Sequence, residues 1–249
     1  MAKRLRIFAG PNGSGKTTFI KNFHFHSDPS IKLGVYVNAD DIEQTLSQNH
    51  SLSLVDFGFA FDTEQVQRHF QRSTFSPTKL ANKNLWENFT VDSERLIVSR
   101  TLSINSYIAA DLAEFLRQNL VSASLSFSFE TVMSDPKKID FLKSAKKSGY
   151  RVYLYYFSTK DPMINISRVS LRMAQHGHAV DPKIIESRYY RSLENLKEAV
   201  MVSDRAYVFD NSGTVSILIA EINEGKHVHV IDPENVPEWF IKYLIEKRY

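Results

Sequence analysis

The sequence has no cysteine among its 249 residues. Disulfide bonds and thiolate metal sites are therefore excluded, which fits a reducing compartment. No stretch of about 18 consecutive apolar residues occurs, so no membrane-spanning helix is expected. The first residues lead directly into the apolar run Leu5 to Ala9 and leave no room for a signal peptide. We expect a soluble, cytoplasmic protein.

An excess of charge of either sign is also lacking. Lys and Arg number 31 against 28 Asp and Glu, a formal net charge of +3, and no long basic run is present. Proteins that bind nucleic acid usually gather basic residues in one patch or stripe, so the charge balance disfavours such a partner. Hydrophobic residues make up 43% of the chain, enough for the buried core of one α/β domain with insertions.

A glycine-rich segment follows the first apolar run. Gly10 to Thr17 matches the P-loop (Walker A) pattern G-x-x-x-x-G-K-[ST] at every fixed position, between a strand-like run and a helix-like run. The backbone N–H groups of such a loop form a nest for phosphate oxygens at a helix N-terminus. The residues expected to bind the nucleotide, ATP or GTP, are Gly10, Pro11, Asn12, Gly13, Ser14, Gly15, Lys16, Thr17 and Thr18.

Two P-loop side chains have more specific expected roles. Lys16 should reach the β- and γ-phosphates, and Thr17 should bind Mg²⁺. The alternative is that a glycine-rich turn merely joins a strand to a helix. The agreement of motif, preceding strand and following helix favours the P-loop.

Two aspartates, Asp40 and Asp41, follow a second short strand expected over 34–37. The carboxyl ends of parallel strands are where α/β folds place their ligands, so we expect one of the two to act on a substrate. The competing interpretation is a helix N-cap for residues 42–46. Two adjacent aspartates allow both roles.

A strand, helix and strand are most clearly recognisable between residues 123 and 157. A buried strand is expected over 123–129, a helix from Pro136 to Ser148, and another buried strand over 151–157. Such near-continuous apolar strands around a helix indicate a parallel sheet buried on both faces. Glu130 and Thr131 would then emerge at the same sheet edge as the P-loop. A surface loop is the alternative for Glu130.

A helix expected over 163–175 places Arg168 and Arg172 four residues apart on one face. It follows the fourth strand, where many small P-loop kinases insert a lid whose arginines cover the transferring phosphoryl group. We therefore predict a lid at about 162–182, against the alternative of two solvated arginines. The next helix, expected over 183–200, carries Arg188 and Arg191 in structural or peripheral roles.

The remaining segments complete the predicted fold. Residues 50–92 are aromatic without a clean period and indicate a packed, partly helical insertion over the acceptor site. Residues 93–120 show helical spacing. A strand is expected over 206–209, and a two-strand ribbon with a closing helix over 215–249. The prediction is a single α/β domain spanning 1–249: a P-loop NTPase-like parallel sheet flanked by helices, with a helical insertion after the second strand and a helical lid.

The ordered set of motifs resembles the zeta-toxin-type P-loop kinases, in particular their chromosomal branch. The segments that carry it are Gly10 to Thr17, Asn38-Ala39-Asp40-Asp41, Phe129-Glu130-Thr131, the helix with Arg168, Gly177 to Val180, and Arg188 to Leu196. The resemblance covers most of the chain apart from about residues 50–92. It implies ATP- and Mg²⁺-dependent transfer of the γ-phosphoryl group to a hydroxyl of a small molecule such as UDP-N-acetylglucosamine, and a separate antitoxin as a possible partner.

The resemblance also implies roles for single residues. Asp40 corresponds to the acceptor-side base and Glu130 to the glutamate that positions the acceptor, while Arg168 matches the first lid arginine. No arginine lies at the family's expected distance beyond Arg168, so Arg172 or Arg188 would have to substitute for the second. Two other functions stay open: a P-loop NTPase acting as a switch, and a nucleic-acid or nucleotide kinase. An acceptor-side base distinguishes the kinase from the switch.

Overall fold

The computed structural model describes residues 3–26, 32–176 and 181–247. The motif Gly177 to Val180 lies outside the described residues. The chain divides into two compact units, one made of Met1–Lys32 with Ser128–Tyr249 (the P-loop unit) and one made of Leu33–Phe127 (the inserted unit). The second unit extends beyond the insertion expected over 50–92 at both ends. The assignment of the whole chain to one domain stays a prediction.

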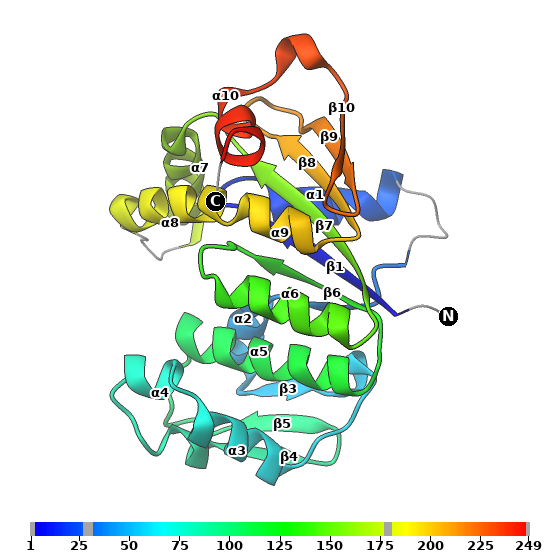
Figure 1. Cartoon of the computed structure of the whole chain (residues 1–249). Coiled ribbons are helices and arrows are strands. Elements are labelled where there is room, and N and C mark those ends of the chain that lie inside the picture. Colours follow the sequence, from blue (N-terminus) through cyan, green and yellow to red (C-terminus); the bar gives the residue numbers. More distant parts are fainter. Residues whose placement is uncertain (1–2, 27–31, 177–180, 248–249) are drawn as a thin grey trace. The chain divides into compact units, whose positions relative to one another are not determined.

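The sheet of the P-loop unit runs in the order β10-β9-β8-β7-β1-β6 (Figure 1). Its strands are β1 (Arg4–Ala9), β6 (Phe127–Thr131), β7 (Arg151–Ser158), β8 (Arg205–Asp210), β9 (Ile217–Asn223) and β10 (His227–Val230). β1, β7 and β8 are parallel neighbours, and β9 and β10 add an antiparallel edge. The strands expected over 151–157 and 206–209 and the ribbon of β9 and β10 are confirmed. The strand expected over 123–129 is wrong in its bounds, because α5 continues to Ser122 and β6 begins only at Phe127 and includes Glu130 and Thr131.

Aromatic side chains stack across neighbouring strands of this sheet. Phe8 of β1 stacks on Tyr155 of β7 at 4.9 Å between ring centroids, and Phe157 stacks on Phe209 of β8 at 4.7 Å. Phe19, from the helix that follows the P-loop, packs 4.8 Å from the ring of Phe157. Aromatic rings bury large apolar areas and favour such offset contacts, so this layer fixes the P-loop helix on the sheet.

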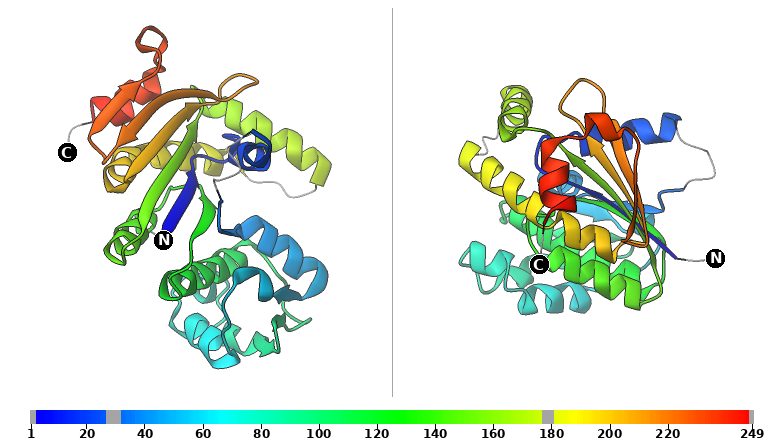
Figure 2. Two further views of the ribbon diagram at one scale, coloured as in Figure 1. Left: turned by 90° about the vertical axis from the view of Figure 1, so that its right-hand side faces the viewer. Right: turned by 45° about the horizontal axis from the view of Figure 1, so that its top comes forward.

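Helices cover both faces of the sheet: α6 and α9 lie on one face and α1 and α7 on the other (Figure 2). The helices of the P-loop unit are α1 (Lys16–His26), α6 (Lys137–Lys147), α7 (Pro162–His176), α8 (Pro182–Glu194), α9 (Leu196–Val202) and α10 (Glu238–Phe240), with short turns η3 (Pro233–Asn235) and η4 (Ile241–Ile245).

The helix expected over 183–200 is wrong as one element, because it is divided at Asn195 between α8 and α9. The Asn195 side chain donates a hydrogen bond to the backbone oxygen of Met133 at 2.9 Å. The expected closing helix likewise consists of α10 and a π-helical turn, η4.

The inserted unit combines helices with a small second sheet. Its elements are β2 (Val35–Val37), α2 (Ala39–Asn49), β3 (Ser51–Ser53), η1 (Val55–Phe57), α3 (Thr63–Arg72), α4 (Ser76–Lys79), η2 (Leu85–Asn88), β4 (Phe89–Asp92), β5 (Arg95–Val98) and α5 (Ser106–Ser122). The three-stranded antiparallel sheet β3-β5-β4 was not expected. Leu96 and Ile97, expected on a helix, lie on β5. The position of this unit over the acceptor site stays a prediction.

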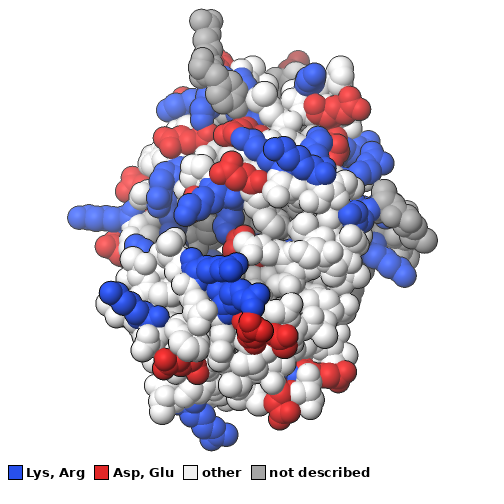
Figure 3. Space-filling view, turned by 60° about the horizontal axis from the view of Figure 1, so that its bottom comes forward, with Lys and Arg blue, Asp and Glu red and all other residues white. Residues whose placement is uncertain are grey.

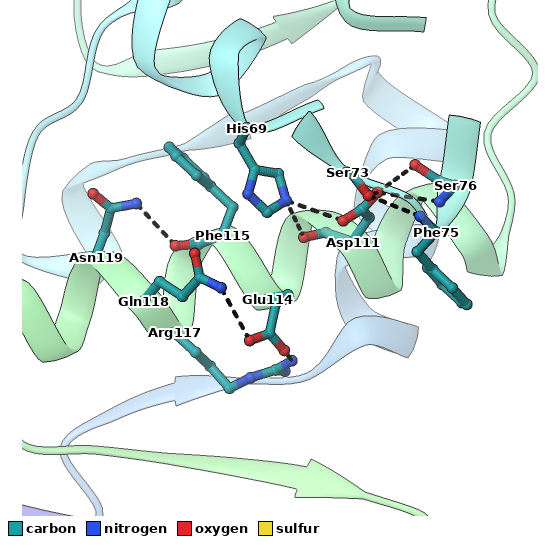
Figure 4. A network of polar contacts seen from close by, with 10 residues as sticks. All are labelled: His69, Ser73, Phe75, Ser76, Asp111, Glu114, Phe115, Arg117, Gln118 and Asn119. Atoms are coloured by element: carbon teal, nitrogen blue, oxygen red, sulfur yellow. Dashed lines mark hydrogen bonds and ion pairs between the residues drawn. The ribbon is translucent and has the colours of Figure 1, made fainter. Parts of the chain in front are cut away.

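A buried carboxylate joins α3 to α5 within the inserted unit (Figure 4). Asp111 of α5 is 4% exposed, and its Oδ1 lies 3.0 Å from Nε2 of His69. Its Oδ2 accepts hydrogen bonds from the hydroxyls of Ser73 at 2.6 Å and Ser76 at 2.5 Å. Burial raises the pKa of Asp111, but the hydrogen bonds from these three side chains outweigh it and hold the pKa below its ordinary value of 3.8.

Asp111→Asn should lower the free energy of unfolding by about 2–3 kcal/mol at pH 7, because two hydroxyls and an imidazole lose a charged acceptor. The folded carboxylate takes up its proton at a lower pH than the unfolded one. Its stabilisation is therefore complete above the ordinary pKa and is lost as the pH falls through the folded pKa, and the variant should lack this acid-dependent loss below about pH 4.

The measurement is urea unfolding at pH 7 and pH 3.5. Trp86 lies in the inserted unit and Trp239 in the P-loop unit, so fluorescence in a Trp239→Phe background reports the inserted unit. Asp92→Asn is the matched control, because Asp92 is an exposed aspartate of the same unit. Equal stability of the Asp111→Asn and Asp92→Asn proteins would contradict the prediction.

None of the helices in the described ranges has the length and apolar character needed to cross a membrane. On the face shown in Figure 3, Lys and Arg side chains are interspersed with Asp and Glu and with broad uncharged areas.

Candidate functional site

The P-loop connects the end of β1 at Ala9 with the start of α1 at Lys16. The Gly10 N–H donates to the backbone oxygen of Thr131, at the end of β6, at 3.2 Å. Within the loop, the Ser14 N–H donates to the oxygen of Pro11 at 3.3 Å. The loop is therefore closed on itself and attached to the strand end that carries Glu130 and Thr131.

Gly13 and Gly15 are among the loop glycines whose backbone conformations and neighbours exclude a side chain. Gly13 has φ +74° and Gly15 has φ +90°, in the region that glycine adopts without strain. A Cβ atom on Gly13 would lie 2.7 Å from the backbone oxygen of Asn165, and one on Gly15 would lie 2.0 Å from Nδ2 of Asn211. These positions let two other segments approach the loop closely.

The Lys16 ammonium lies on the loop itself. Its Nζ donates to the backbone oxygens of Gly10 at 2.8 Å and Pro11 at 2.9 Å, and the residue is 8% exposed. In the described part of the chain, the buried hydroxyl oxygen of Ser14 has no hydrogen-bond partner. A buried cation and a buried polar atom without a partner both fit a loop that takes an anionic ligand.

The structure brings together Thr17 and Glu130, two of the residues predicted from the sequence. The Thr17 hydroxyl donates to Oε2 of Glu130 at 2.9 Å. A hydroxyl and a carboxylate fit Mg²⁺, which usually takes one or two protein oxygens and completes its shell with phosphate and water. Among the described residues, no group of three or more His, Asp or Glu side chains forms a metal site by itself.

Of the predicted lid arginines, Arg168 is held against the segment that follows β8. Its guanidinium donates to the backbone oxygens of Asn211 and Gly213, both at 2.7 Å. Arg172 lies one turn further along α7 and is exposed. On α8, Arg188 is half-buried and Arg191 is exposed.

The segment after β8 and the first turns of α7 carry site residues that sequence reasoning missed. Asn211 donates from Nδ2 to the oxygen of Ser14 at 2.8 Å, and Asn165 of α7 donates from Nδ2 to the oxygen of Asn12 at 2.6 Å. Asp210 accepts hydrogen bonds from the Ser212 N–H at 2.9 Å and from Nε1 of Trp239 at 2.8 Å. The available signal was Asp210-Asn211-Ser212 at the end of a parallel strand, where ligand sites form.

The predicted substrate residues Asp40 and Asp41 lie in the inserted unit, in the first turn of α2, and both are exposed. The alternative that one of them caps the helix is wrong. Asn38 is the N-cap, because its side-chain oxygen accepts from the Asp40 N–H at 2.9 Å and its extended backbone precedes the helix. Two acidic residues remain in the first turn, where the helix dipole favours negative charge.

In a comparison with protein families, the zeta toxin family model matches residues 98–222, just over half of the chain. The match includes Glu130, Asn165, Arg168 and Asn211 and begins after the P-loop. An uncharacterised protein of Haemophilus influenzae is 29% identical over 69 residues, which cover 28% of this chain and 49% of that protein. The aligned part therefore spans about half the length of the curated relative.

Solved structures of similar fold include the AvrRxo1-ORF1:AvrRxo1-ORF2 complex and a toxin–antitoxin system. The AvrRxo1-ORF1:AvrRxo1-ORF2 complex with sulphate ions gives a TM-score of 0.57 at 14% identity, over 94% of this chain and 62% of that one. The same complex with ATP gives 0.52 at 13% identity, with the same coverage. The PezAT toxin–antitoxin system of Streptococcus pneumoniae gives 0.50 at 13% identity, over 99% of this chain and 80% of that one. These matches confirm the predicted α/β fold class.

Proposed function

Because the chain belongs to the zeta toxin family, we propose that it is an ATP- and Mg²⁺-dependent phosphotransferase. The observation that carries the proposal is the P-loop with its two attached side chains: Lys16 beside the Gly10 oxygen at 2.8 Å and Thr17 bonded to Glu130 at 2.9 Å. Phosphoryl transfer needs mainly positioning and neutralisation of charge. A buried ammonium on a phosphate nest meets that need.

The site residues have separate roles in the proposed phosphoryl transfer. Lys16 neutralises charge on the β- and γ-phosphates, and the N–H groups of the P-loop orient them. Thr17 would hold Mg²⁺, which neutralises phosphate charge when bound. Glu130 would hold the metal through water or position the acceptor hydroxyl with Thr131. Arg168, with Arg172 or Arg188, would stabilise the transferring group.

ATP is the proposed nucleotide and GTP the alternative. The solved AvrRxo1 complex that contains ATP supports ATP at the level of fold. Hydrogen bonds within the protein also hold the P-loop. The Trp239 indole donates to Asp210, and the neighbouring residue Asn211 donates to the Ser14 oxygen.

The proposed acceptor is a hydroxyl of a small molecule, with a nucleotide sugar such as UDP-N-acetylglucosamine as the first candidate. Asp40 is the proposed general base, with Asp41 and Thr131 as acceptor contacts. The family resemblance supports these assignments. A separate antitoxin is the proposed partner, since the similar solved structures include a toxin–antitoxin system. The proposed location is the cytoplasm.

The test is incubation of the purified protein with γ-labelled ATP, Mg²⁺ and UDP-N-acetylglucosamine, alongside a small-molecule cell extract and an RNA extract. We expect label in a small molecule and none when Mg²⁺ is chelated. Release of labelled inorganic phosphate alone, at a rate that no acceptor changes, would favour the NTPase switch. Label in RNA would favour the nucleic-acid kinase.

A further inference from the structure

Two asparagine side chains donate hydrogen bonds to backbone oxygens of the P-loop. Asn165 donates to the backbone oxygen of Asn12 at 2.6 Å, and Asn211 donates to that of Ser14 at 2.8 Å. Both are in the P-loop unit, on the segments that follow β7 and β8. The two carbonyls are alternate ones along the loop.

The geometry of the peptide group converts these contacts into an orientation of the phosphate-binding N–H groups. The Asn12 carbonyl shares its peptide group with the Gly13 N–H, and the Ser14 carbonyl shares its group with the Gly15 N–H. A trans peptide is planar, and its C=O and N–H bonds point in opposite directions. An asparagine bonded to the carbonyl therefore fixes the N–H of the same peptide group in the opposite direction, away from the asparagine. A nest binds anions through such N–H groups.

Gly13 and Gly15 leave the space that these asparagine contacts need. A Cβ on Gly15 would lie 2.0 Å from Nδ2 of Asn211, and one on Gly13 would lie 2.7 Å from the backbone oxygen of Asn165. Any other residue at these positions would displace the asparagine or the segment that carries it. The P-loop motif and the two asparagines therefore form one packed arrangement.

Both asparagines are themselves held in place. Asn165 is fully buried, and its Oδ1 accepts a hydrogen bond from the Thr159 hydroxyl. The Asn211 N–H donates to the oxygen of Ser158 at 2.8 Å, and its own backbone oxygen accepts from Arg168 at 2.7 Å. A side chain fixed in this way imposes its geometry on the loop, as positioning residues of preorganised sites do.

We infer that Asn165 and Asn211 are positioning residues that aim the Gly13 and Gly15 N–H groups at the phosphates of the nucleotide. The inference rests on the proposed function and deepens it. The two side chains serve the polyphosphate part of the ligand. Because Arg168 is bonded to the backbone of Asn211, the arginine and the Gly15 N–H are positioned by the same residue.

The probe is inorganic tripolyphosphate, which tests the loop without a nucleoside. Asn211→Ala and Asn165→Ala should each weaken its binding about five- to tenfold, the loss expected for one oriented hydrogen-bond donor. Lys16→Ala should weaken it as well. Asn223→Ala is the matched control, because it removes a comparable hydrogen bond, which Nε of Arg205 donates to Oδ1 of Asn223 at 2.9 Å, on β9 next to the edge strand β10. It should bind tripolyphosphate as the wild type does.

A second measurement tests the orientation directly. The chain has only nine glycines, so ¹⁵N-glycine labelling gives a simple amide spectrum. On addition of tripolyphosphate, the shift of the Gly15 resonance should be lost in Asn211→Ala, and that of Gly13 in Asn165→Ala. If Asn165→Ala does not fold, the half-buried Asn211 carries the test alone.

The outcomes separate the inference from the proposed function. Wild-type affinity and wild-type glycine shifts in both asparagine variants, with binding lost in Lys16→Ala, would overturn the inference and leave the proposed function intact. Wild-type affinity in Lys16→Ala as well would overturn the P-loop assignment itself. Equal weakening in Asn223→Ala would show that the effect is general destabilisation and would also overturn the inference.

Discussion

Replacement of Lys16 by alanine should lower phosphoryl transfer by about a thousandfold or more and leave the fold intact. The ammonium lies 2.8 Å from the Gly10 oxygen and 2.9 Å from the Pro11 oxygen, which places its charge at the loop that should hold the phosphates. Charge shifts onto the β–γ bridge during transfer, and a fixed cation stabilises that change more than it stabilises the bound substrate. The measurement is the rate of transfer of labelled phosphate.

Two further variants make this result interpretable. Lys16→Met keeps most of the buried aliphatic stem, so equal loss of activity in Lys16→Met and Lys16→Ala assigns the effect to the charge. Lys143→Ala removes a half-exposed lysine of α6 that pairs with Glu198 at 2.6 Å, and it should be as active as the wild type. Wild-type turnover in a folded Lys16→Ala protein would refute the P-loop assignment.

Asp40→Asn should lower transfer to the acceptor by roughly a hundredfold or more, because the amide keeps the shape of the side chain and removes the basic oxygen. ATP binding should persist, since the P-loop is unchanged. Asp41→Asn is the neighbouring variant for comparison: both aspartates are exposed and lie in the first turn of α2, but Asp41 is proposed as an acceptor contact and not as the base. Since Asn38 is the cap, Asp41→Asn should cost only a few tenths of a kcal/mol through the helix dipole.

The two variants should be compared in transfer and in acceptor-free ATP hydrolysis. Loss of only the transfer reaction in Asp40→Asn supports the base. If both activities fall and ATP affinity falls with them, Asp40 holds the metal instead. The reverse ranking of the two variants would assign the base to Asp41.

Much of the P-loop unit could be predicted from the sequence because its signals are local. The strands β1, β7 and β8 are short apolar runs close to a glycine or an aspartate, and the P-loop pattern fixes the residue types that its backbone tolerates. The capping residues of α7 and α8 are also local, since Asp161 and Asp181 precede prolines and accept from N–H groups in the first turn.

The inserted unit was harder to predict because its sheet depends on pairing between distant segments. β3 has three residues, and its partner β5 lies more than 40 residues further along the chain. A strand of four residues, Arg95–Val98, offers too few positions to distinguish alternation from helical spacing. The N-cap of α2 was expected at Asp40 or Asp41, two or three positions beyond Asn38, because all three are good capping residues.

In the candidate site, the residue types of the P-loop could be predicted and their supports could not. Asn165 and Asn211 lie 153 and 197 positions from the carbonyls that they hold. Asparagine is common in turns and gives no periodic signal, so only the folded sheet reveals that these two side chains meet the loop. The contact of Thr17 with Glu130, 113 positions apart, is equally non-local.

The arrangement of the P-loop supports also sets when the loop can take its shape during synthesis. Residues 10–17 leave the ribosome early. However, β1 can pair with β7 only after β7 has been made, and the Ser14 carbonyl can accept its hydrogen bond only after Asn211 has been made. At about 5–20 residues per second, translation from the loop to Asn211 takes on the order of 10 to 40 s. The contiguous inserted unit, Leu33–Phe127, is complete long before then. A nascent chain therefore carries an unsupported P-loop until most of the polypeptide has been made, and its phosphate site forms only after that.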